Sequence, residues 1–388
     1  ILDLCENTNF VVAKVWIREG SRSDPINKKG LHQLLANCLT RGCGKYDNEM
    51  MAEIIESSGA SFRSDANEDG ILISLKCAKE DHLKLITLIN LMISKPTLES
   101  KQINLEKDLT IQAIKRQKEN PYHLAYKNWK KVVYKGLIYE HDTIGTIKDI
   151  INTRRIDLQK LAKELRSRKK IIVIKGDIDK KSLVNIFNAK ENEYQEITTT
   201  VNFINNDSEP KNQDRIIYED IDSSQVVIMY GSKSTSHSNL DDIKLRVLSS
   251  HLGSGMSSVL FKRLREEYGL TYDIGIYNPI REYQTPFLIH CSTTNTKAAD
   301  AYKNIRDCLN QSLSEHLSSG ELELAKTKLI SSINHNSQTL AQKSERKAIL
   351  LGYGMNENFD LDTKEYIKTL TRKDILQVAQ KYLNDPFL

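Results

Sequence analysis

The 388-residue sequence predicts an α+β protein made of two homologous halves. The chain is longer than one hydrophobic core usually supports, which favours two or more domains. A polar stretch over residues 191–214 contains Asn, Asp and Pro, and the order of predicted strands and helices starts again after it. We therefore expect an N-terminal half over residues 1–190, a linker over 191–214 and a C-terminal half over 215–388.

A short internal repeat supports this division. The runs TIKDI at 146–150 and TKEYI at 363–367 are 217 residues apart (363 − 146 = 217), and Asp157 and Asp374 share that spacing. Both Asp residues stand at the entrance of a predicted helix, where a carboxylate can accept hydrogen bonds from unpaired backbone N–H groups. Asp caps are common, so the repeat gains weight from the matching strand and helix order of the two halves.

The first half begins with a strand. Residues 10–17 (FVVAKVWI) are rich in β-branched and aromatic residues, and the turn-forming run GSRSDPIN at 20–27 follows. Helical periodicity predicts a first helix over 31–41 and further helices over 47–57, 81–93, 98–119 and 121–134. The turn NEDG at 67–70 leads into a strand over 71–77, and IIVI at 171–174 predicts a short buried strand.

The second half repeats this order. Residues 225–230 (QVVIMY) predict a strand, and helices over 240–252 and 257–268 flank the loop GSG at 253–255. Further strands are expected at 271–277 and 286–292, and further helices at 297–317, 321–334 and 338–351.

Composition indicates a globular chain without a nucleic-acid or membrane-spanning signature. Hydrophobic residues make up 39% and charged residues 28%, and the net charge is only +5 because 56 basic and 51 acidic residues are interspersed. A nucleic-acid-binding protein would show a concentrated basic stripe or a known motif, and neither is present. The basic runs 166–170 and Lys130–Lys131 are expected on solvated helical faces. There is no run of about 18 apolar residues, so no transmembrane helix is predicted.

The Cys residues are spread without C-x-x-C pairs, at positions 5, 38, 43, 77, 291 and 308. This pattern favours core packing in a reducing compartment over a disulfide framework. We therefore expect a cytoplasmic protein. Because the sequence begins at Ile1 rather than Met, removal of a targeting segment, and with it an organellar or periplasmic location, stays open.

The stretch GLHQLLANCLTRG at 30–42 has the frame of a zinc-binding helix without its ligands. In an H-x-x-E-H helix the two His residues, at i and i+4, share one face and bind one Zn²⁺, while the Glu activates a zinc-bound water. The same frame here holds Gln33, Ala36 and Asn37. None of these side chains replaces a ligand of a three-ligand zinc site, so the sequence predicts no metal on this helix.

The nine His residues offer no second zinc helix, because no two of them have this spacing and no H-x-H occurs. His32 lies next to the ligand frame but faces about 100° away on a helix. We expect ordinary surface or core histidines, and assembly of distant His residues into a site is the open alternative.

The landmarks of the chain, taken in order, resemble the insulinase/pitrilysin-type metallopeptidases, especially the group with bacterial peptidases and mitochondrial processing peptidase. They cover nearly the whole chain: Gly20-Ser21-Arg22, the helix Gly30 to Gly42, Glu119-Asn120-Pro121, Leu124-Ala125-Tyr126, Gly145-Thr146, and the segment from Gly255-Met256-Ser257-Ser258 through Gly269-Leu270-Thr271-Tyr272. The resemblance implies that each half is a mostly antiparallel sheet with helices packed on one face, in a clamshell fold.

The resemblance also implies a third zinc ligand, a Glu on the long helix after the H-x-x-E-H motif. Counting from Asn37 places that ligand at Ala113 (113 − 37 = 76). Glu106 is available nearby but lies two turns earlier, facing another point. All four zinc-site positions, Gln33, Ala36, Asn37 and Ala113, have therefore lost their chemistry.

The second half keeps the family's paired substrate-contacting residues. The segment LREEYGLTY places Arg265 and Tyr272 at the two motif positions. Arg265 is expected in the last turn of a helix, with Gly269 as its left-handed stop and Tyr272 at the start of the next strand. The resemblance implies that guanidinium and phenol converge on one peptide carbonyl, as an oxyanion-stabilising pair does. A helix-surface Arg and a half-buried strand Tyr are the alternative.

Two other features depart from familiar patterns. The loop GSGMSS at 253–258 lacks the Lys-Ser/Thr of a P-loop, and the family landmark explains it better, with Ser257 or Ser258 as a helix cap. Active family members have Asn-Ala before an edge strand that accepts extended peptide, and Arg63-Ser64 stands at that place here. The resemblance therefore does not carry peptide binding over to this edge.

These observations favour a zinc-less subunit of a two-chain peptidase. A homologous zinc-bearing partner would form the heterodimer and cleave the peptide substrate, and this chain would supply Arg265 and Tyr272 in trans without a cofactor of its own. The alternative is a structural or peptide-binding subunit, like the family's core proteins of respiratory complexes, in which the pair is vestigial. A self-sufficient peptidase with an unrecognised site is a third hypothesis.

Overall fold

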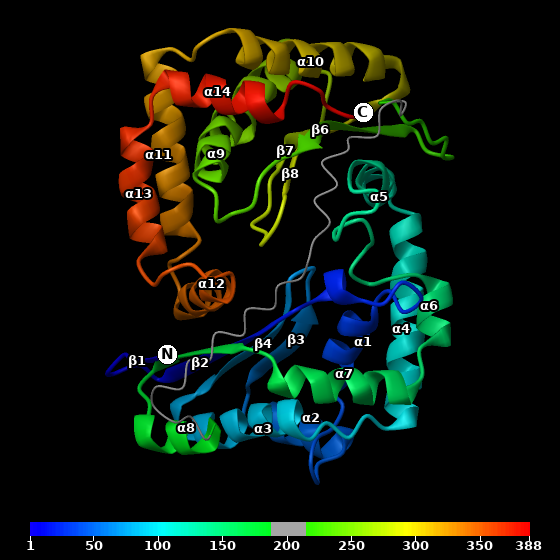
Figure 1. Cartoon of the computed structure of the whole chain (residues 1–388), viewed down its shortest axis with the longest axis vertical. Helices are drawn as coiled ribbons and strands as arrows, with labels where there is room; N and C mark the ends of the chain where they lie inside the picture. The colour runs from blue at the N-terminus through cyan, green and yellow to red at the C-terminus, as the bar shows by residue number, and fades with distance from the viewer. Residues whose placement is uncertain (188–214) are drawn as a thin grey trace. The chain divides into compact units, whose positions relative to one another are not determined.

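The computed structural model describes residues 1–187 and 215–388, which form two compact units (Figure 1). The first unit contains Ile1–Ile111, the described part of Thr143–Arg215, and Thr339–Gly352. The second contains Gln112–Asp142, Ile216–Gln338 and Tyr353–Leu388. Each unit is built mainly from one predicted half and takes a helical segment from the other. The predicted linker 191–214 lies outside the described residues, and the half boundaries at 190 and 215 stay a prediction.

The first unit holds a five-stranded sheet in the order β1-β5-β2-β4-β3. Its strands are β1 (Leu2–Leu4), β2 (Phe10–Arg18), β3 (Ser61–Ala66), β4 (Gly70–Ala78) and β5 (Lys170–Gly176). Only β1 and β5 run parallel, and the other neighbours are antiparallel. Every residue from Val11 to Ile17 in the central strand β2 is buried, so this sheet is covered on both faces.

The helices of the first unit explain this two-sided burial. They are α1 (Leu31–Leu39), α2 (Asn48–Ser57), α3 (His82–Ser94), most of α4 (Ser100–Lys118), α6 (Ile147–Asn152), α7 (Arg155–Ser167), α8 (Lys180–Phe187) and α12 (Leu340–Gly352). Helices α1, α3 and α7 form one core with Val11, Val15 and Ile17. Helix α12 covers the opposite face, where Lys14 pairs with Glu345 at 2.5 Å.

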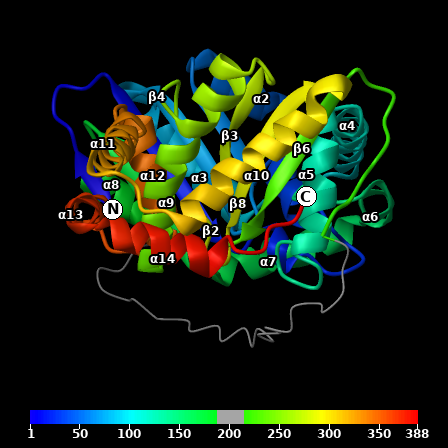
Figure 2. The same ribbon diagram turned by 90° about the horizontal axis from the view of Figure 1, so that it is seen from above.

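The second unit holds a smaller sheet with the same pairing order. Strands β6 (Gln225–Lys233), β7 (Asp273–Tyr277) and β8 (Pro286–Thr294) pair as β6-β8-β7, the antiparallel arrangement that β2, β4 and β3 have in the first unit. Its helices are α5 (Pro121–Val133), α9 (Leu240–Gly253), α10 (Ala298–Ser314), α11 (Ser319–His335), α13 (Phe359–Thr369) and α14 (Arg372–Tyr382). Helices α10 (yellow) and α14 (red), which contact each other, can be followed in Figure 2.

Strand β6 is also covered on both faces, by helices from different parts of the sequence. Its residues Ile228 and Tyr230 belong to a core formed with α9, α10, α11 and α14. Its residues Val227 and Met229 face a second cluster, which contains Trp129 of α5. Helix α5 thus covers the second sheet as α12 covers the first, and each comes from the opposite sequence half.

The structure confirms the predicted α+β class and most of the predicted elements. The Asp caps of the repeat are present: Asp157 accepts the N–H of Arg154 at 2.7 Å, and Asp374 accepts that of Thr371 at 2.8 Å. All six Cys are free. Within the described ranges, no helix combines the length and the apolar character that a membrane span requires.

Two expectations need correction. The helix predicted over 257–268 contains a π-helical segment, η3 (Phe261–Glu267), rather than regular α-helix throughout. Lys130 does not lie on a solvated face: it is 2% exposed, with its ammonium 5.9 Å from the centre of the Tyr126 ring. Lys131, the other residue of that run, is exposed as expected.

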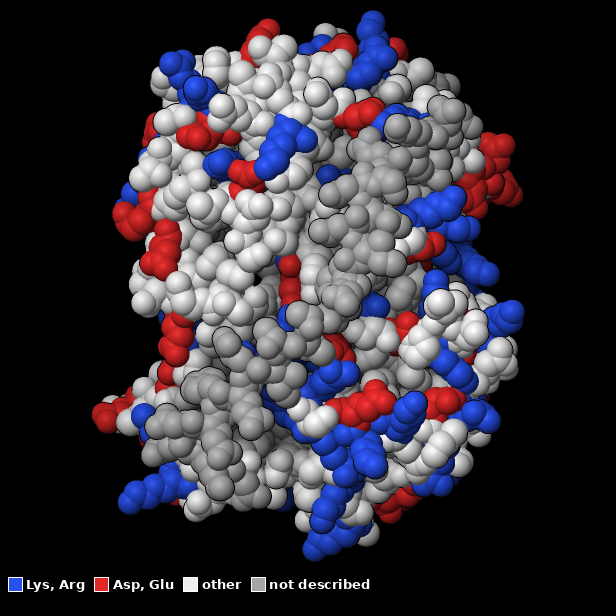
Figure 3. All heavy atoms as spheres, viewed as in Figure 1, with Lys and Arg blue, Asp and Glu red and all other residues white. Residues whose placement is uncertain are grey.

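The other basic run does lie near solvent. Arg166 and Lys169 are exposed and Arg168 and Lys170 are half-buried, at the end of α7 and the start of β5. Figure 3 shows Lys and Arg interspersed with Asp and Glu, with a denser group of basic side chains on the first unit, in the lower part of the view. Basic and acidic side chains are thus mixed on this face, as expected for a chain with a net charge of only +5.

Candidate functional site

The first candidate site lies on α1, the helix with the zinc-binding frame. Gly30 begins it in a left-handed conformation (φ 91°), and a Cβ there would lie 2.5 Å from the Ile144 carbonyl oxygen. Asp24 acts as a remote cap and accepts the N–H groups of Gly30 at 2.6 Å and His32 at 3.0 Å. The apolar side of the helix, Leu31, Leu34, Leu35 and Leu39, is buried in the core.

The two positions that would carry His ligands hold amides that bond to each other. Gln33 donates from Nε2 to Asn37 Oδ1 at 2.7 Å, across one turn of α1. Gln33 Oε1 accepts the backbone N–H of Ala66, the last residue of β3, at 3.1 Å. These contacts tie α1 to the sheet, which gives both residues a structural role.

The positions of the family's carboxylates offer no metal ligand. Ala36 is 0% exposed, and Ala113 is a half-buried residue of α4. Glu106 is buried in the first unit and paired with Arg41, whose Nε and Nη2 lie 2.6 and 2.5 Å from Glu106 Oε1. If Glu106 bound a metal, Arg41 would lose its carboxylate partner. Breaking an ion pair with a buried member costs free energy.

His32 is a core residue rather than a ligand beside the frame. Its ring is 2% exposed, and Nδ1 lies 2.7 Å from Asp24 Oδ1. Its Nε2 has no hydrogen-bond partner among the described residues. Over the same residues, no group of three or more His, Cys, Asp and Glu side chains could hold a metal ion.

The second candidate site lies in the second unit, where η3 leads into β7. Tyr268 donates its N–H to the Arg263 carbonyl at 3.3 Å, five residues back, which is the bond pattern of a π-helical turn. Arg265 lies in this segment as predicted, and Gly269 ends it with a left-handed φ of 58°. Single π turns are frequent at functional sites because they displace one side chain from the regular helical spacing.

Arg265 and Tyr272 are in direct contact through the backbone. Arg265 donates from Nη1 to the main-chain carbonyl of Tyr272 at 3.2 Å, and its guanidinium lies 5.0 Å from the Phe261 ring centre. Tyr272 directly precedes β7, and the residue as a whole is 76% exposed. The remaining Arg265 N–H groups and the Tyr272 hydroxyl are hydrogen-bond donors at an open surface.

Sequence reasoning did not identify a polar group beside Tyr272. Asp273, the next residue, lies 3.3 Å from Nδ1 of His290 on β8. The His290 ring packs edge-on against Tyr122 of α5, with 5.3 Å between ring centres. Burial lowers the pKa of His290, and Asp273 opposes this shift only in part. The sequence shows Asp273 directly after Tyr272. Its partner His290 is seventeen residues further along the chain (290 − 273 = 17), so the sequence does not show their contact.

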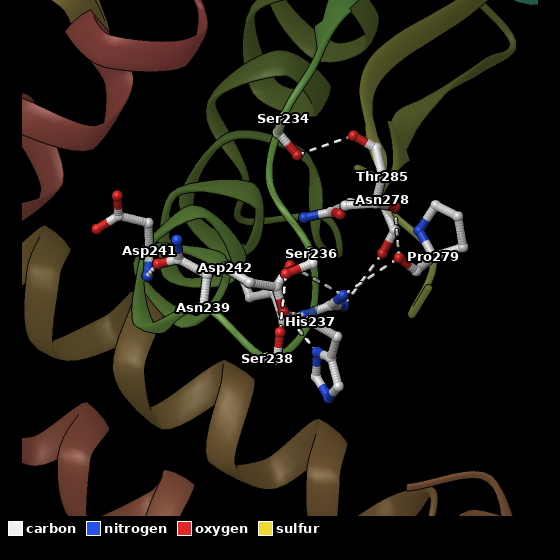
Figure 4. Close-up of polar contacts among 11 residues, drawn as sticks. Ser234, Ser236, His237, Ser238, Asn239, Asp241, Asp242, Asn278, Pro279 and Thr285 are labelled. Carbon is white, nitrogen blue, oxygen red and sulfur yellow. Dashed lines mark hydrogen bonds and ion pairs between the residues drawn. The ribbon is translucent and has the colours of Figure 1, made fainter. Parts of the chain in front are cut away.

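A second buried His–Asp pair stabilises the start of α9 (Figure 4). His237 Nδ1 lies 2.6 Å from Asp242 Oδ2, and Arg246 donates to the same carboxylate at 2.7 and 3.2 Å. Burial raises the pKa of Asp242, but Arg246 and His237 outweigh it and hold that pKa below its usual value. The nearby Ser236 and Ser238 hydroxyls bond each other at 2.9 Å. We interpret the contacts of His237, Asp242 and Arg246 as structural, stabilising the start of α9.

Comparison with known proteins places these sites in a family. Residues 4–146 match the profile described as Insulinase (Peptidase family M16), and residues 157–329 match that described as Peptidase M16 inactive domain. An uncharacterized zinc protease of Rickettsia bellii is 24% identical over 378 residues, covering 96% of this chain and 90% of that protein. A non-peptidase homolog, YmxG of Helicobacter pylori, is 23% identical over 371 residues, covering 92% and 82%.

The fold agrees with solved structures. A peptidase M16 inactive domain from Pseudomonas fluorescens superposes with a TM-score of 0.85 at 20% identity, covering 99% of this chain and 93% of that one. The two family profiles, the fold and the replaced ligand frame agree with one another. The chain belongs to the insulinase family of peptidases (peptidase family M16), as a member whose zinc-binding residues are replaced.

Proposed function

We propose that this chain is the zinc-less subunit of a two-chain peptidase. A homologous partner with an intact H-x-x-E-H helix holds the zinc and cleaves the peptide, and this chain contributes Arg265 and Tyr272 to the bound substrate. The observation that carries the proposal is the contrast between the two sites. Gln33 and Asn37 bond each other, whereas Arg265 contacts Tyr272, a residue that is 76% exposed.

The geometry supports a specific role for each residue of the pair. One Nη of Arg265 is bonded to the Tyr272 carbonyl, which fixes the guanidinium near the base of that side chain. The other N–H groups of Arg265 and the Tyr272 hydroxyl can donate to a peptide carbonyl oxygen as negative charge develops on it. Donors of this kind stabilise the transition state, and neither residue has to transfer a proton to do so.

The peptide itself would be aligned by the partner chain. Strand β3 is the edge of the first sheet, but Gln33 Oε1 already accepts the N–H of Ala66. Arg63 and Asp65 form an exposed 2.6 Å ion pair on the same strand. Charged side chains on an edge strand oppose the addition of another strand. We infer that β3 of this chain does not bind substrate, and that the complex works in the cytoplasm, as the Cys usage suggests.

The experiment reconstitutes the pair. Affinity purification at native expression identifies the homologous chain, and the purified complex is assayed for peptide cleavage and for zinc per chain. Arg265→Ala should lower kcat/KM by about 10²-fold, the effect of removing one oxyanion donor, and Tyr272→Phe should also lower it. Zinc should be found at one atom per pair, retained by the partner alone.

Matched controls separate this role from general damage. Arg372→Ala and Tyr218→Phe change exposed side chains of the same types, and both should leave cleavage unchanged. Unchanged cleavage in Arg265→Ala and Tyr272→Phe would sink the proposal. A stable complex without peptidase activity would instead support a structural subunit; one relative, from Helicobacter pylori, is named a non-peptidase homolog.

A further inference from the structure

A cavity of about 530 Å³ lies in the second unit, along the same η3 segment that carries Arg265. Its walls come from the end of α9, from η3 and its flanks, and from α11. Helices α9 and α11 lie side by side (Figure 1). The volume falls in the range of small-molecule sites, about 300–1,000 Å³.

Two Lys side chains, Lys262 of η3 and Lys328 of α11, line this cavity without a carboxylate partner. Neither forms an ion pair with any described residue, and Lys328 donates only to the Ser254 carbonyl, at 3.0 Å. Burial, and after it the charge of Lys262, lowers the pKa of Lys328. Because both ammonium groups line one cavity, an anion bound between them would interact favourably with both.

The carboxylates in the cavity wall do not neutralise these cations. Glu321 caps its own helix, where Oε2 accepts the Ser318 N–H at 2.8 Å. Glu267, at the end of η3, forms no ion pair with a described residue and is exposed. Both carboxylates are hydrogen-bond acceptors that a hydroxyl-bearing ligand can use.

His251 adds a neutral donor to the same wall. Burial lowers its pKa, the charge of Lys328 acts in the same direction, and Glu321 opposes them. A neutral imidazole can donate one hydrogen bond to an anion while adding no charge to the two ammonium groups. The cavity therefore combines a cationic wall with acceptors suited to hydroxyl groups.

We propose that this cavity binds a small phosphate-bearing polyol of the sugar-phosphate class. The phosphate lies between Lys262 and Lys328, and the hydroxyl groups face Glu267 and Glu321. A phosphate ion alone would fill only part of the 530 Å³. Arg265 and Tyr272 do not line this cavity, so the proposal is independent of the peptidase role and is tested by binding rather than by cleavage.

Titration calorimetry with ribose 5-phosphate, inorganic phosphate and ribose, at constant ionic strength, tests this site. We expect ribose 5-phosphate to bind one per chain, inorganic phosphate to bind more weakly, and ribose not to bind. Lys262→Met and Lys328→Met should each weaken ribose 5-phosphate by about tenfold, as expected for a lost charge-assisted hydrogen bond. Glu267→Gln should weaken ribose 5-phosphate but not inorganic phosphate.

Lys303→Met is the control, because Lys303 is an exposed residue of α10 outside the cavity. Its affinity for ribose 5-phosphate should equal that of the unchanged chain. Thermal unfolding of each variant without ligand checks that the fold is kept. No saturable binding of ribose 5-phosphate, equal affinity for inorganic phosphate, or full affinity in both cavity Lys variants would each overturn the proposal.

Discussion

At positions 33 and 37 the chain holds two amides where the family has two His ligands. Gln33 and Asn37 keep the i, i+4 geometry but direct it to a hydrogen bond with each other and with β3. Ala36, between them, is 0% exposed. The residues at these positions therefore belong to the packing of α1, and position 36 is fully buried.

Ala36→Glu should strongly destabilise the protein. A carboxylate at this fully buried position has no partner, so we expect the free energy of unfolding to fall by about 3 kcal/mol or more at pH 7. Urea unfolding measures the loss, which should shrink at pH 4 as the new carboxyl group becomes neutral. Ala113→Glu, at a half-buried helical position, is the control and should cost less than about 1 kcal/mol. Equal stability of the two variants would show that position 36 tolerates the family's Glu.

Local spacing predicts a lost zinc site, because the ligand frame spans one helical turn. The partners of the substituted residues could not be read from spacing, since Gln33 bonds Ala66 and Arg41 pairs with Glu106. The motif around Arg265 predicted its helix and the Gly269 stop. It did not predict that the guanidinium bonds the main-chain carbonyl of Tyr272, because spacing alone does not give the path of the chain through the turn at Gly269.

Helices α9 and α14 pack in one hydrophobic core, and a carboxylate of α9 also links them. Asp241, in the first turn of α9, accepts from Lys381 at 2.8 Å and Tyr382 at 3.1 Å on α14, and from Lys244 at 2.9 Å on its own helix. Burial alone would raise the pKa of Asp241, but these hydrogen bonds and charges lower it to about 2. The same contacts raise the pKa of Lys381 to about 12.

The contribution of Asp241 to stability should depend on pH. Its pKa in the folded chain lies below the ordinary value of 3.8, so its stabilisation is present above pH 4 and is lost as pH falls towards 2. Asp241→Asn should lower the free energy of unfolding by about 1 kcal/mol at pH 7, typical of partly exposed ion pairs. Denaturant unfolding at pH 7 and pH 2 measures the difference in unfolding free energy between Asp241→Asn and the unchanged chain. This difference should disappear near pH 2.

Asp300→Asn is the matched control, because Asp300 also lies in the first turn of a helix but forms no ion pair with a described residue. Its effect should be small at both pH values. A loss for Asp241→Asn that is the same at pH 7 and pH 2 would contradict the assignment, since it would not follow the charge.

Elements with a strong local pattern were predicted within a few residues, and those that depend on distant contacts were not. Strand β1 is three residues long and joins the sheet by parallel pairing with β5, in which Leu2 lies opposite Ile174. The segment FKRLREE was interpreted as regular helix, because composition does not distinguish a π turn from an α-helical one. At the end of η3, Leu270 donates its backbone N–H to the Leu264 carbonyl at 2.7 Å, a contact that composition does not predict.

Across the whole chain, the two halves exchange one helix each. Helix α12 from the second half covers β2, where a Cβ at Gly352 would lie 2.2 Å from Trp16. Helix α5 from the first half covers β6, where Trp129 packs in the cluster with Met229. The repeat found in the sequence predicts homologous halves but not this exchange, because each half has the same order of elements whether its helix packs on its own sheet or on the other.

The exchange predicts that neither half folds alone. Residues 1–187 lack α12, so Trp16, now 1% exposed, would lose its cover, and residues 215–388 lack α5, which covers Val227 and Met229. We expect each fragment to bind a hydrophobic dye and to unfold without a cooperative transition, because a large apolar face stays uncovered. An equimolar mixture should regain a cooperative transition in thermal unfolding, since both exchanged helices are then available. Fusing residues 339–352 to fragment 1–187 through a flexible linker should restore cooperativity to that fragment alone, whereas a linker of the same length without the helix should not. If the unfused fragment 1–187 unfolds as sharply and at the same temperature as the intact chain, α12 is dispensable and the exchange does not hold the first unit together.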